Sequence, residues 1–287
     1  MRIGISASSL DATGYGRFGN ATYLKLKEHG FDCTDFNMAD TKSSLYTETV
    51  SQAEATLCRE RELAHAAGIE IHQVHGPWRF PPQDATEEDR KERMEKMKKS
   101  IYLTTVLGCK NWVVHPIMPL GLDDVDTDDA LRTWAMNFVF MEELLETAKA
   151  HDVTICLENM PMHKFSMSKP KEILNFVQQI GDDHFKICLD TGHVSVFPEL
   201  DLAEETRKLG KEIRVLHVHD NRYNCDMHLN PYDGIIPWES FGNALRDIRF
   251  DGVFSLETQP GTKLPDTLFE EKSRHLVHIC KFITGTV

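Results

Sequence analysis

Short apolar or β-branched runs alternate with long amphipathic stretches along the whole chain, and this alternation is what most constrains the fold. Eight runs are typical of buried strands: 2–6, 31–36, 69–75, 111–116, 153–159, 185–190, 213–220 and 252–258. Eight stretches are typical of helices: 18–29, 48–67, 86–107, 128–151, 169–181, 200–210, 238–247 and 266–283. Strands that are apolar on both faces and separated by helices predict a parallel sheet covered by helices.

Closure of eight strand–helix repeats into a (β/α)8 barrel, the TIM barrel, is the simplest arrangement, and a doubly wound open sheet is the alternative. The 287 residues suit one such barrel, and no change in composition marks a linker, so we expect a single domain over 1–287. An open sheet would favour a dinucleotide site at Gly14, Gly16 and Gly19. The first of these glycines lies eight residues beyond the first strand run, and only Asp35 offers an acidic partner. We interpret 13–20 as a loop.

Composition narrows the class of protein. The net charge of −13 disfavours binding to nucleic acid, although it does not exclude a local basic groove. Seven cysteines without a CxxC pair argue against a disulfide framework or a zinc ribbon. No apolar run approaches the roughly 18 residues that span a bilayer, and the N-terminus has no signal-peptide layout. We expect a cytoplasmic protein with reduced thiols and no membrane contact.

Side chains that bind metals end six consecutive strand runs. They are His75, His115, Glu158, Asp190, His217 and Glu257. The loops that follow add His193, Asp226 and His228. One histidine at a strand end is usually structural, but the carboxyl ends of barrel strands meet at one mouth. Imidazoles and carboxylates gathered there would repel one another or lack partners without cations, so the series predicts a divalent-metal centre.

A second histidine follows His217 on the same strand run. His217 and His219 point to the same side, because strand side chains alternate with period two. We expect one of them to be a ligand and prefer His217. His219 would then contact substrate or support a ligand.

Several motifs carry a resemblance to a known family. HGPW, VVHP, CLEN, LDTGH, LHVHDN, DMHLNPYDGIIPW and SLET resemble those of the xylose isomerase-like TIM-barrel superfamily, over the third to eighth strand runs. That superfamily holds sugar isomerases, epimerases and dehydratases, and the endonuclease IV group of DNA-repair enzymes. In its isomerase and epimerase branch the resemblance implies one ion, commonly manganese, held by Glu158, Asp190, His217 and Glu257. In its nuclease branch the resemblance implies three zinc ions on all nine positions. The sequence therefore leaves open whether the site binds one, two or three ions, and whether they are Zn²⁺ or Mn²⁺.

The choice between the branches rests on charge and ligand number. Nine ligands favour the nuclease, since clustered ions clamp the attacking and leaving oxygens of a phosphodiester. The acidic surface, and the lack of Arg and Lys clusters after the first two strand runs, favour the sugar enzyme. The DMHLNPYDGIIPW loop also resembles one found in sugar phosphate isomerase/epimerase-like proteins. We expect a sugar isomerase or epimerase, with a zinc-dependent abasic-site (AP) endonuclease as the alternative and a non-catalytic sugar-binding barrel as the third hypothesis.

The resemblance implies a mechanism for the sugar enzyme. Glu158 and Glu257 would be the base and acid that move a proton through an enediolate. The expected substrate is a small carbohydrate whose identity and phosphorylation stay open, and family members often form homo-oligomers. Expected substrate contacts are His193, His219, Arg222, Lys164 and Trp78, with Phe165 and Tyr232 as further apolar walls.

Two positions depart from the related sequences. Many ketose epimerases carry a substrate-binding Glu where this chain has Lys164, and the related loop usually has glycine where this chain has Tyr232. Lys164, Lys169 or Arg222 would suit a phosphate or carboxylate group. Solvated lysines and ordinary aromatic packing are the alternative interpretations.

Overall fold

The computed structural model describes residues 1–11, 13–125, 127–223 and 225–286. Its centre is one sheet of eight parallel strands in the order β7-β6-β5-β4-β3-β2-β1-β8. The strands are β1 (Arg2–Ser6), β2 (Cys33–Asn37), β3 (Glu70–His75), β4 (Asn111–Val114), β5 (Thr154–Glu158), β6 (Phe185–Asp190), β7 (Ile213–His217) and β8 (Val253–Leu256). The first and last residues of each strand agree with those of the predicted run to within three residues.

The ring of strands is closed. β8 pairs in parallel with β1, and a parallel bridge joins Val218, just after β7, to Leu256 of β8. The amide of Val218 donates to the carbonyl of Ser255 at 2.8 Å, and the amide of Glu257 donates to the carbonyl of Val218 at 3.0 Å. The predicted (β/α)8 barrel is therefore confirmed and the open-sheet alternative is wrong.

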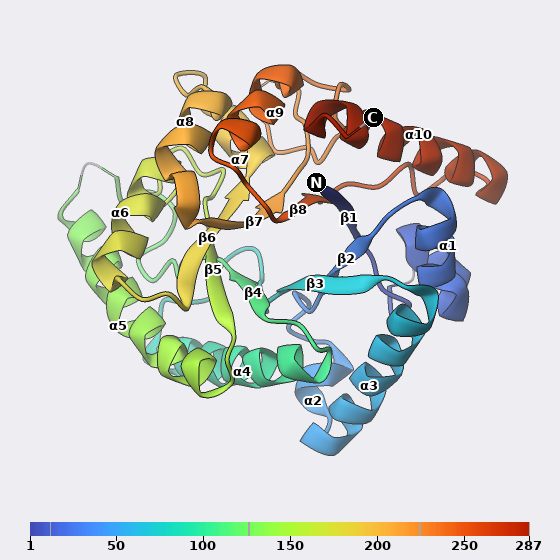
Figure 1. Ribbon diagram of the computed structural model, residues 1–287. Coiled ribbons are helices and arrows are strands. Elements are labelled where there is room, and N and C mark those ends of the chain that lie inside the picture. The colour runs from blue at the N-terminus through green and yellow to red at the C-terminus, as the bar shows by residue number, and fades with distance from the viewer. Residues whose placement is uncertain (12, 126, 224, 287) are drawn as a thin grey trace.

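Helices surround the strands as an outer layer (Figure 1). The longer ones are α1 (Thr22–His29), α3 (Val50–Ala67), α4 (Glu87–Val106), α5 (Asp128–Ala150), α6 (Pro170–Ile180), α8 (Leu202–Leu209), α9 (Trp238–Asp247) and α10 (Asp266–Thr284). Short turns of helix are η1 (Gly14–Ala21), α2 (Ser44–Thr47), α7 (Thr191–Ser195) and η2 (Gly210–Glu212). Within the described residues, no helix is long and apolar enough to span a membrane.

Local sequence signals explain the helix bounds. Thr49 caps α3 in a reciprocal capping box with Gln52, and Thr86 accepts from the Asp89 amide at the start of α4. Gly68 ends α3 in the left-handed region, at φ 71°, where glycine is favoured. These devices satisfy backbone groups that a helix end leaves free.

The segment predicted as a loop at 13–20 folds differently. It forms most of η1, because Tyr15 is buried against Phe31 and Phe269 and its carbonyl accepts from the Thr22 hydroxyl. A Cβ atom on Gly16 would lie 1.5 Å from the carbonyl oxygen of Asp11. Close backbone packing therefore explains the glycine at this position, and a phosphate-binding role is not needed to explain it.

The barrel interior holds its own small apolar cluster. Val113, Cys156, Cys188 and Val215, from β4 to β7, form a buried cluster separate from the large core between the strands and the helices. Side chains two positions further along each strand point the same way, one layer nearer the C-terminal mouth. That layer carries the site.

Candidate metal centre

The layer above the interior cluster consists of metal-ligand side chains. Each residue of the interior cluster is followed, two positions later, by a buried metal-ligand side chain. These side chains are, in the order of Val113, Cys156, Cys188 and Val215, His115, Glu158, Asp190 and His217. His75, the last residue of β3, and Glu257, the residue directly after β8, bring the number of these groups to six. The strand period therefore places six such groups in one layer, at the face where barrel enzymes carry their active sites.

An inner cluster combines Glu158, Asp190, His217 and Glu257, with one ligand atom of each within 4.8 Å of the others. His217 Nδ1 lies 3.1 Å from Glu158 Oε1 and 3.4 Å from Glu257 Oε2. Among the described residues this buried nitrogen has no hydrogen-bond partner. A buried imidazole nitrogen between two carboxylates fits a divalent cation, because buried polar atoms are otherwise almost always paired.

A second cluster shares Glu158 with the first and adds His75 and His115. The two imidazole Nε2 atoms are 3.2 Å apart, and His115 Nε2 is 3.1 Å from Glu158 Oε2. Ligands of a tetrahedral zinc ion with Zn–N bonds of about 2.05 Å stand about 3.3 Å apart. The spacing of this cluster therefore fits zinc.

An outer cluster lies toward the rim and contains His193, His219, Asp226 and His228. Asp226 Oδ2 lies 3.4 Å from His193 Nε2 and 3.5 Å from His228 Nε2. Asp226 and His228 are partly exposed, with side-chain exposures of 30% and 42%. His219 stacks on His228 with ring centroids 4.1 Å apart and touches Asp190 at 3.1 Å, so it lies between the inner and outer clusters.

Four of the imidazoles are anchored through one nitrogen, which leaves the other for a ligand bond. The Nδ1 atoms of His75, His193 and His228 lie 2.7 to 2.9 Å from backbone carbonyls. His217 instead uses Nε2, which lies 2.9 Å from Asp35 Oδ2. Anchoring of this kind sets the tautomer and the ring orientation of metal-binding histidines.

Protonation differs between the clusters. Burial lowers the pKa of His115 to about 4. Burial also opposes the charge on His193 and His228, but nearby carboxylates, Asp190 and Asp226 foremost, outweigh it and raise both pKa values to about 10. Without a bound cation, these outer imidazoles therefore carry protons at neutral pH.

The two glutamates of the inner cluster are shifted in opposite directions. Burial raises the pKa of Glu257. Burial acts in the same direction on Glu158, but His217 and His115 outweigh it and hold the pKa of Glu158 well below its usual range. Two carboxyl groups whose pKa values are pushed apart are suited to act as an acid and a base.

Two supporting carboxylates were not singled out as site residues by the sequence analysis. Asp35 binds His217 and also accepts from Gln73 Nε2 at 3.1 Å. The buried Asp220 accepts from the indole of Trp238 and from five backbone amides of the loop between β7 and α9, which carries Asp226 and His228. An acidic residue inside an apolar strand run is the signal that could have marked Asp35.

One glycine of the LDTGH motif is required by packing. A Cβ atom on Gly192 would lie 1.8 Å from Cε1 of His219. The start of α7 can therefore pass over the imidazole only with glycine at this position.

The clusters open into a cavity of about 580 Å³ at the mouth of the barrel. Its lining comprises Asn37, Ala39, His75, Trp78, Phe80, His115, Leu122, Glu158, Met160, Pro161, Met162, His193, Val196, Asp226, His228 and Glu257. Trp78 thus lies where the sequence predicts. The lining contains neither lysine nor arginine among the described residues.

Other expected substrate contacts lie elsewhere. Lys164 is exposed and pairs with Asp123 at 2.9 Å, and the Nε atom of Arg222 donates to the carbonyl of Asp233. Phe165 is buried in the core. Tyr232 is half exposed and has φ 71°, a conformation that explains glycine in the related loop. The structure brings none of the four to the cavity.

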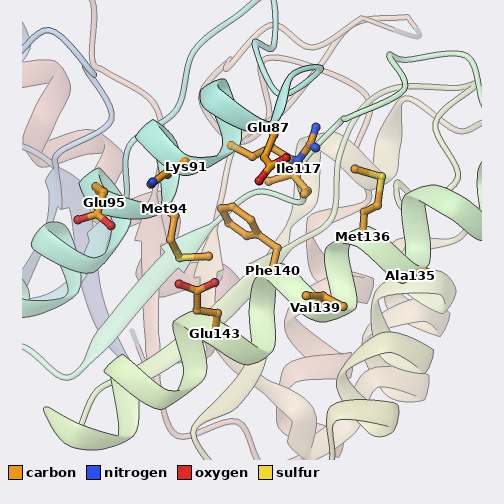
Figure 2. A pocket seen from close by; sticks show the side chains of 11 residues that line it. Glu87, Lys91, Met94, Glu95, Ile117, Ala135, Met136, Val139, Phe140 and Glu143 are labelled. Carbon is orange, nitrogen blue, oxygen red and sulfur yellow. The ribbon is translucent and has the colours of Figure 1, made fainter.

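A second cavity, of about 710 Å³, lies on the outer surface between α4 and α5. Figure 2 shows Met94 and Phe140 between the two helices, with Glu95 and Glu143 nearby. It is larger than the mouth cavity but contains none of the metal clusters. We therefore place the chemistry at the mouth, where imidazoles and carboxylates converge.

Comparison with known families identifies the group to which the chain belongs. Residues 24–277 match the family described as the xylose isomerase-like TIM barrel. The chain belongs to this family. The predicted resemblance is thereby confirmed.

Relatives within the xylose isomerase-like family differ in function. The D-psicose 3-epimerase of Enterocloster bolteae is 33% identical over 118 residues, 41% of this chain and 37% of that enzyme. A probable endonuclease 4 of Mycoplasmopsis agalactiae is 24% identical over 63% of this chain and 66% of its own. The crystal structure of a D-tagatose 3-epimerase-like protein has a TM-score of 0.76 at 25% identity and covers 99% of this chain and 97% of its own. The chain is thus similar both to proteins named as sugar epimerases and to proteins named as endonucleases.

Proposed function

We propose that the protein is a divalent-metal-dependent sugar isomerase or epimerase that moves a proton through an enediolate. The observation that carries the proposal is the inner cluster, in which Glu158 and Glu257 flank His217 and have pKa values shifted apart. Similarity to a D-tagatose 3-epimerase-like protein over 99% of this chain supports it.

Each residue of the inner cluster has a role in the proposed reaction. Glu158, Asp190, His217 and Glu257 would hold Mn²⁺ or Zn²⁺. Such an ion polarises a substrate carbonyl and so acidifies the neighbouring C–H bond. Glu158 removes that proton, since its low pKa keeps it ionised, and Glu257 returns a proton to the carbon. His193, which lines the cavity, orients a hydroxyl group, whereas the fully buried His219 supports Asp190 at 3.1 Å.

The cavity suits an unphosphorylated sugar. Its lining carries no cationic side chain other than histidine in the described part of the chain, whereas phosphate groups are usually held by arginine, lysine or helix N-termini. Lys169, like Lys164, is held in an ion pair, with Glu199 at 2.7 Å. Among the described residues that line the cavity, no lysine or arginine lies beside the inner cluster to bind a phosphate.

An AP endonuclease is the second candidate. The observation in its favour is that ten residues, the nine predicted ligands and His219, fall into three clusters, more than one-ion sugar chemistry requires. The cation-free lining and the net charge of −13 oppose it, because a nucleic-acid backbone is bound mainly by lysine and arginine.

A direct comparison of substrates tests the proposal. Protein loaded with Mn²⁺ or Zn²⁺ is incubated with D-fructose, D-tagatose and L-ribulose, and in parallel with abasic duplex DNA. We expect a new sugar isomer in at least one ketose reaction and no incision of the DNA. Incision without any change in the ketoses would contradict the proposal and establish the endonuclease.

The proposed setting of the enzyme is the cytoplasm. All seven cysteines are free, five of them buried, as expected in a reducing compartment. Assembly into a homo-oligomer stays a prediction.

A further inference from the structure

An apolar wall borders one side of the mouth cavity. It is made by Trp78, Phe80, Leu122, Met160, Met162 and Val196, which follow β3, β4, β5 and β6. The same lining includes the cluster residues His75, His115, Glu158, His193, Asp226, His228 and Glu257. The lining therefore has a polar half, formed by the cluster residues, and an apolar half, formed by the six side chains of the wall.

The aromatic part of this wall runs without a gap from a metal-ligand position to solvent. The Trp78 ring packs on the His115 ring at 4.4 Å between centroids, and Phe80 follows at 6.4 Å from Trp78. Phe80 is 66% exposed. Exposed aromatic side chains beside a cavity are typical of ligand-binding surfaces.

Trp78 has a further contact with a buried cation. The guanidinium of Arg93 lies 5.9 Å from the Trp78 ring centroid, and Arg93 is itself buried in an ion pair with Asp84. Trp78 is therefore fixed before a ligand arrives, which lowers the entropy lost on binding.

The volume of the cavity exceeds that of a single sugar. A free hexose occupies roughly 200 Å³ at the packing density of a protein interior, whereas the cavity measures about 580 Å³. A hexose seated on the inner cluster would leave the apolar half in contact with water.

We propose that the apolar wall is a subsite for a hydrophobic substituent, aromatic or alkyl, attached to the end of the sugar remote from its carbonyl. This inference rests on the proposed function, since the sugar end is placed at the inner cluster. The substituent lies along Trp78 and Phe80 and reaches Leu122 and Met162. Free monosaccharides fill only the polar half.

Binding measurements on the Mn²⁺-loaded protein test the subsite without requiring turnover. Calorimetric titrations compare D-fructose, 6-O-methyl-D-fructose and 6-O-benzyl-D-fructose. We expect the benzyl ether to bind about tenfold or more tightly than the methyl ether, because its ring buries apolar surface on the wall. Equal affinities would overturn the inference.

Two variants localise the effect. Phe80→Ser should reduce the benzyl preference to within about threefold, whereas Phe282→Ser, which alters a similarly exposed phenylalanine near the end of α10, should preserve it. A Phe80→Ser protein that keeps the full preference would contradict the subsite. A benzyl preference in a protein that isomerises no ketose would support the subsite and count against the proposed function.

Discussion

At the residue scale, the ligand properties of His217 depend on a carboxylate on the far side of the barrel. Asp35 lies 182 positions away in sequence and binds Nε2, so that Nδ1 faces the inner cluster. Its negative charge makes the imidazole a stronger ligand. A side chain that touches no substrate thus controls the geometry at the metal position.

Replacing Asp35 with Asn tests this role. The substitution keeps the shape but removes the charge, so we expect metal affinity to fall by roughly 10- to 100-fold with the fold retained. Titration with Mn²⁺, followed by calorimetry, measures the change. Asp183→Asn removes the same charge from a fully exposed position and should bind metal like the parent. Equal affinities in the two variants would show that Asp35 is not needed.

The raised pKa values of His193 and His228, each about 10, predict proton release at the outer cluster. A metal ion competes with these protons, so apparent affinity should increase as pH rises from about 6.5 toward 10. At pH 7.5, zinc binding in buffers of different ionisation enthalpy should reveal released protons. The His193→Gln protein should release fewer protons than the parent when it binds zinc. Affinity that is independent of pH would contradict the assigned charges.

At the element scale, the loop between β7 and α9 depends on one buried acid. Asp220 accepts hydrogen bonds from five backbone amides and one indole, and the loop that these amides belong to carries Asp226 and His228. Removing the acceptor would leave these donors without partners. Each donor that stays buried would then lower the free energy of unfolding by about 1 to 3 kcal/mol. The loop and the outer cluster therefore form one unit.

Asp220→Ala should destabilise this unit more than the barrel. We expect loss of at least about 3 kcal/mol of unfolding free energy and of metal binding at the outer cluster, with the inner cluster still able to bind. Urea denaturation and metal analysis after desalting measure the two effects. Asp233→Ala, in the same loop but exposed, is the matched control. An unchanged unfolding curve would contradict the assignment of Asp220.

Strand ends could be predicted from the sequence, whereas loop directions could not. Period two fixes which side of a strand His115 or Glu158 occupies, and the barrel then brings them to one mouth. Lys164 has no such constraint, and its partner Asp123 comes from a different loop. Asp35 and Asp220 act through hydrogen bonds to distant segments, which no local pattern reveals. The loop expected at 13–20 became η1 because burial of Tyr15 depends on contacts with Phe31 and Phe269.

At the scale of the whole molecule, the fold gathers charges that favour cation binding. The alternation of strands and helices was sufficient to predict the barrel, because helix-covered parallel strands have few ways to close. It was not sufficient to distinguish one ion from three, because Glu158 belongs to two clusters and the number of ions depends on distances between strands.

Metal removal should therefore destabilise the whole barrel. Ions that bind only the folded state add about 2.7 kcal/mol at 100 times their Kd, and each kcal/mol shifts Tm by roughly 2–4 °C in a chain of this size. We expect EDTA to lower Tm by about 5 °C or more and Mn²⁺ or Zn²⁺ to restore it. Calorimetry before and after chelation provides the measurement. A Tm unchanged by chelation, in protein shown to contain metal beforehand, would contradict a centre that binds only the folded barrel.

The central claim is that the inner cluster moves a proton on a sugar carbon, and solvent exchange tests it most directly. Metal-loaded protein is incubated in D₂O with the ketose that it converts, and NMR monitors the carbon beside the carbonyl. We expect deuterium at that carbon with the parent protein, and at least about 100-fold slower exchange with Glu257→Gln, whose metal content is measured in the same sample. Full exchange by a Glu257→Gln protein that retains its metal would show that Glu257 does not move the proton.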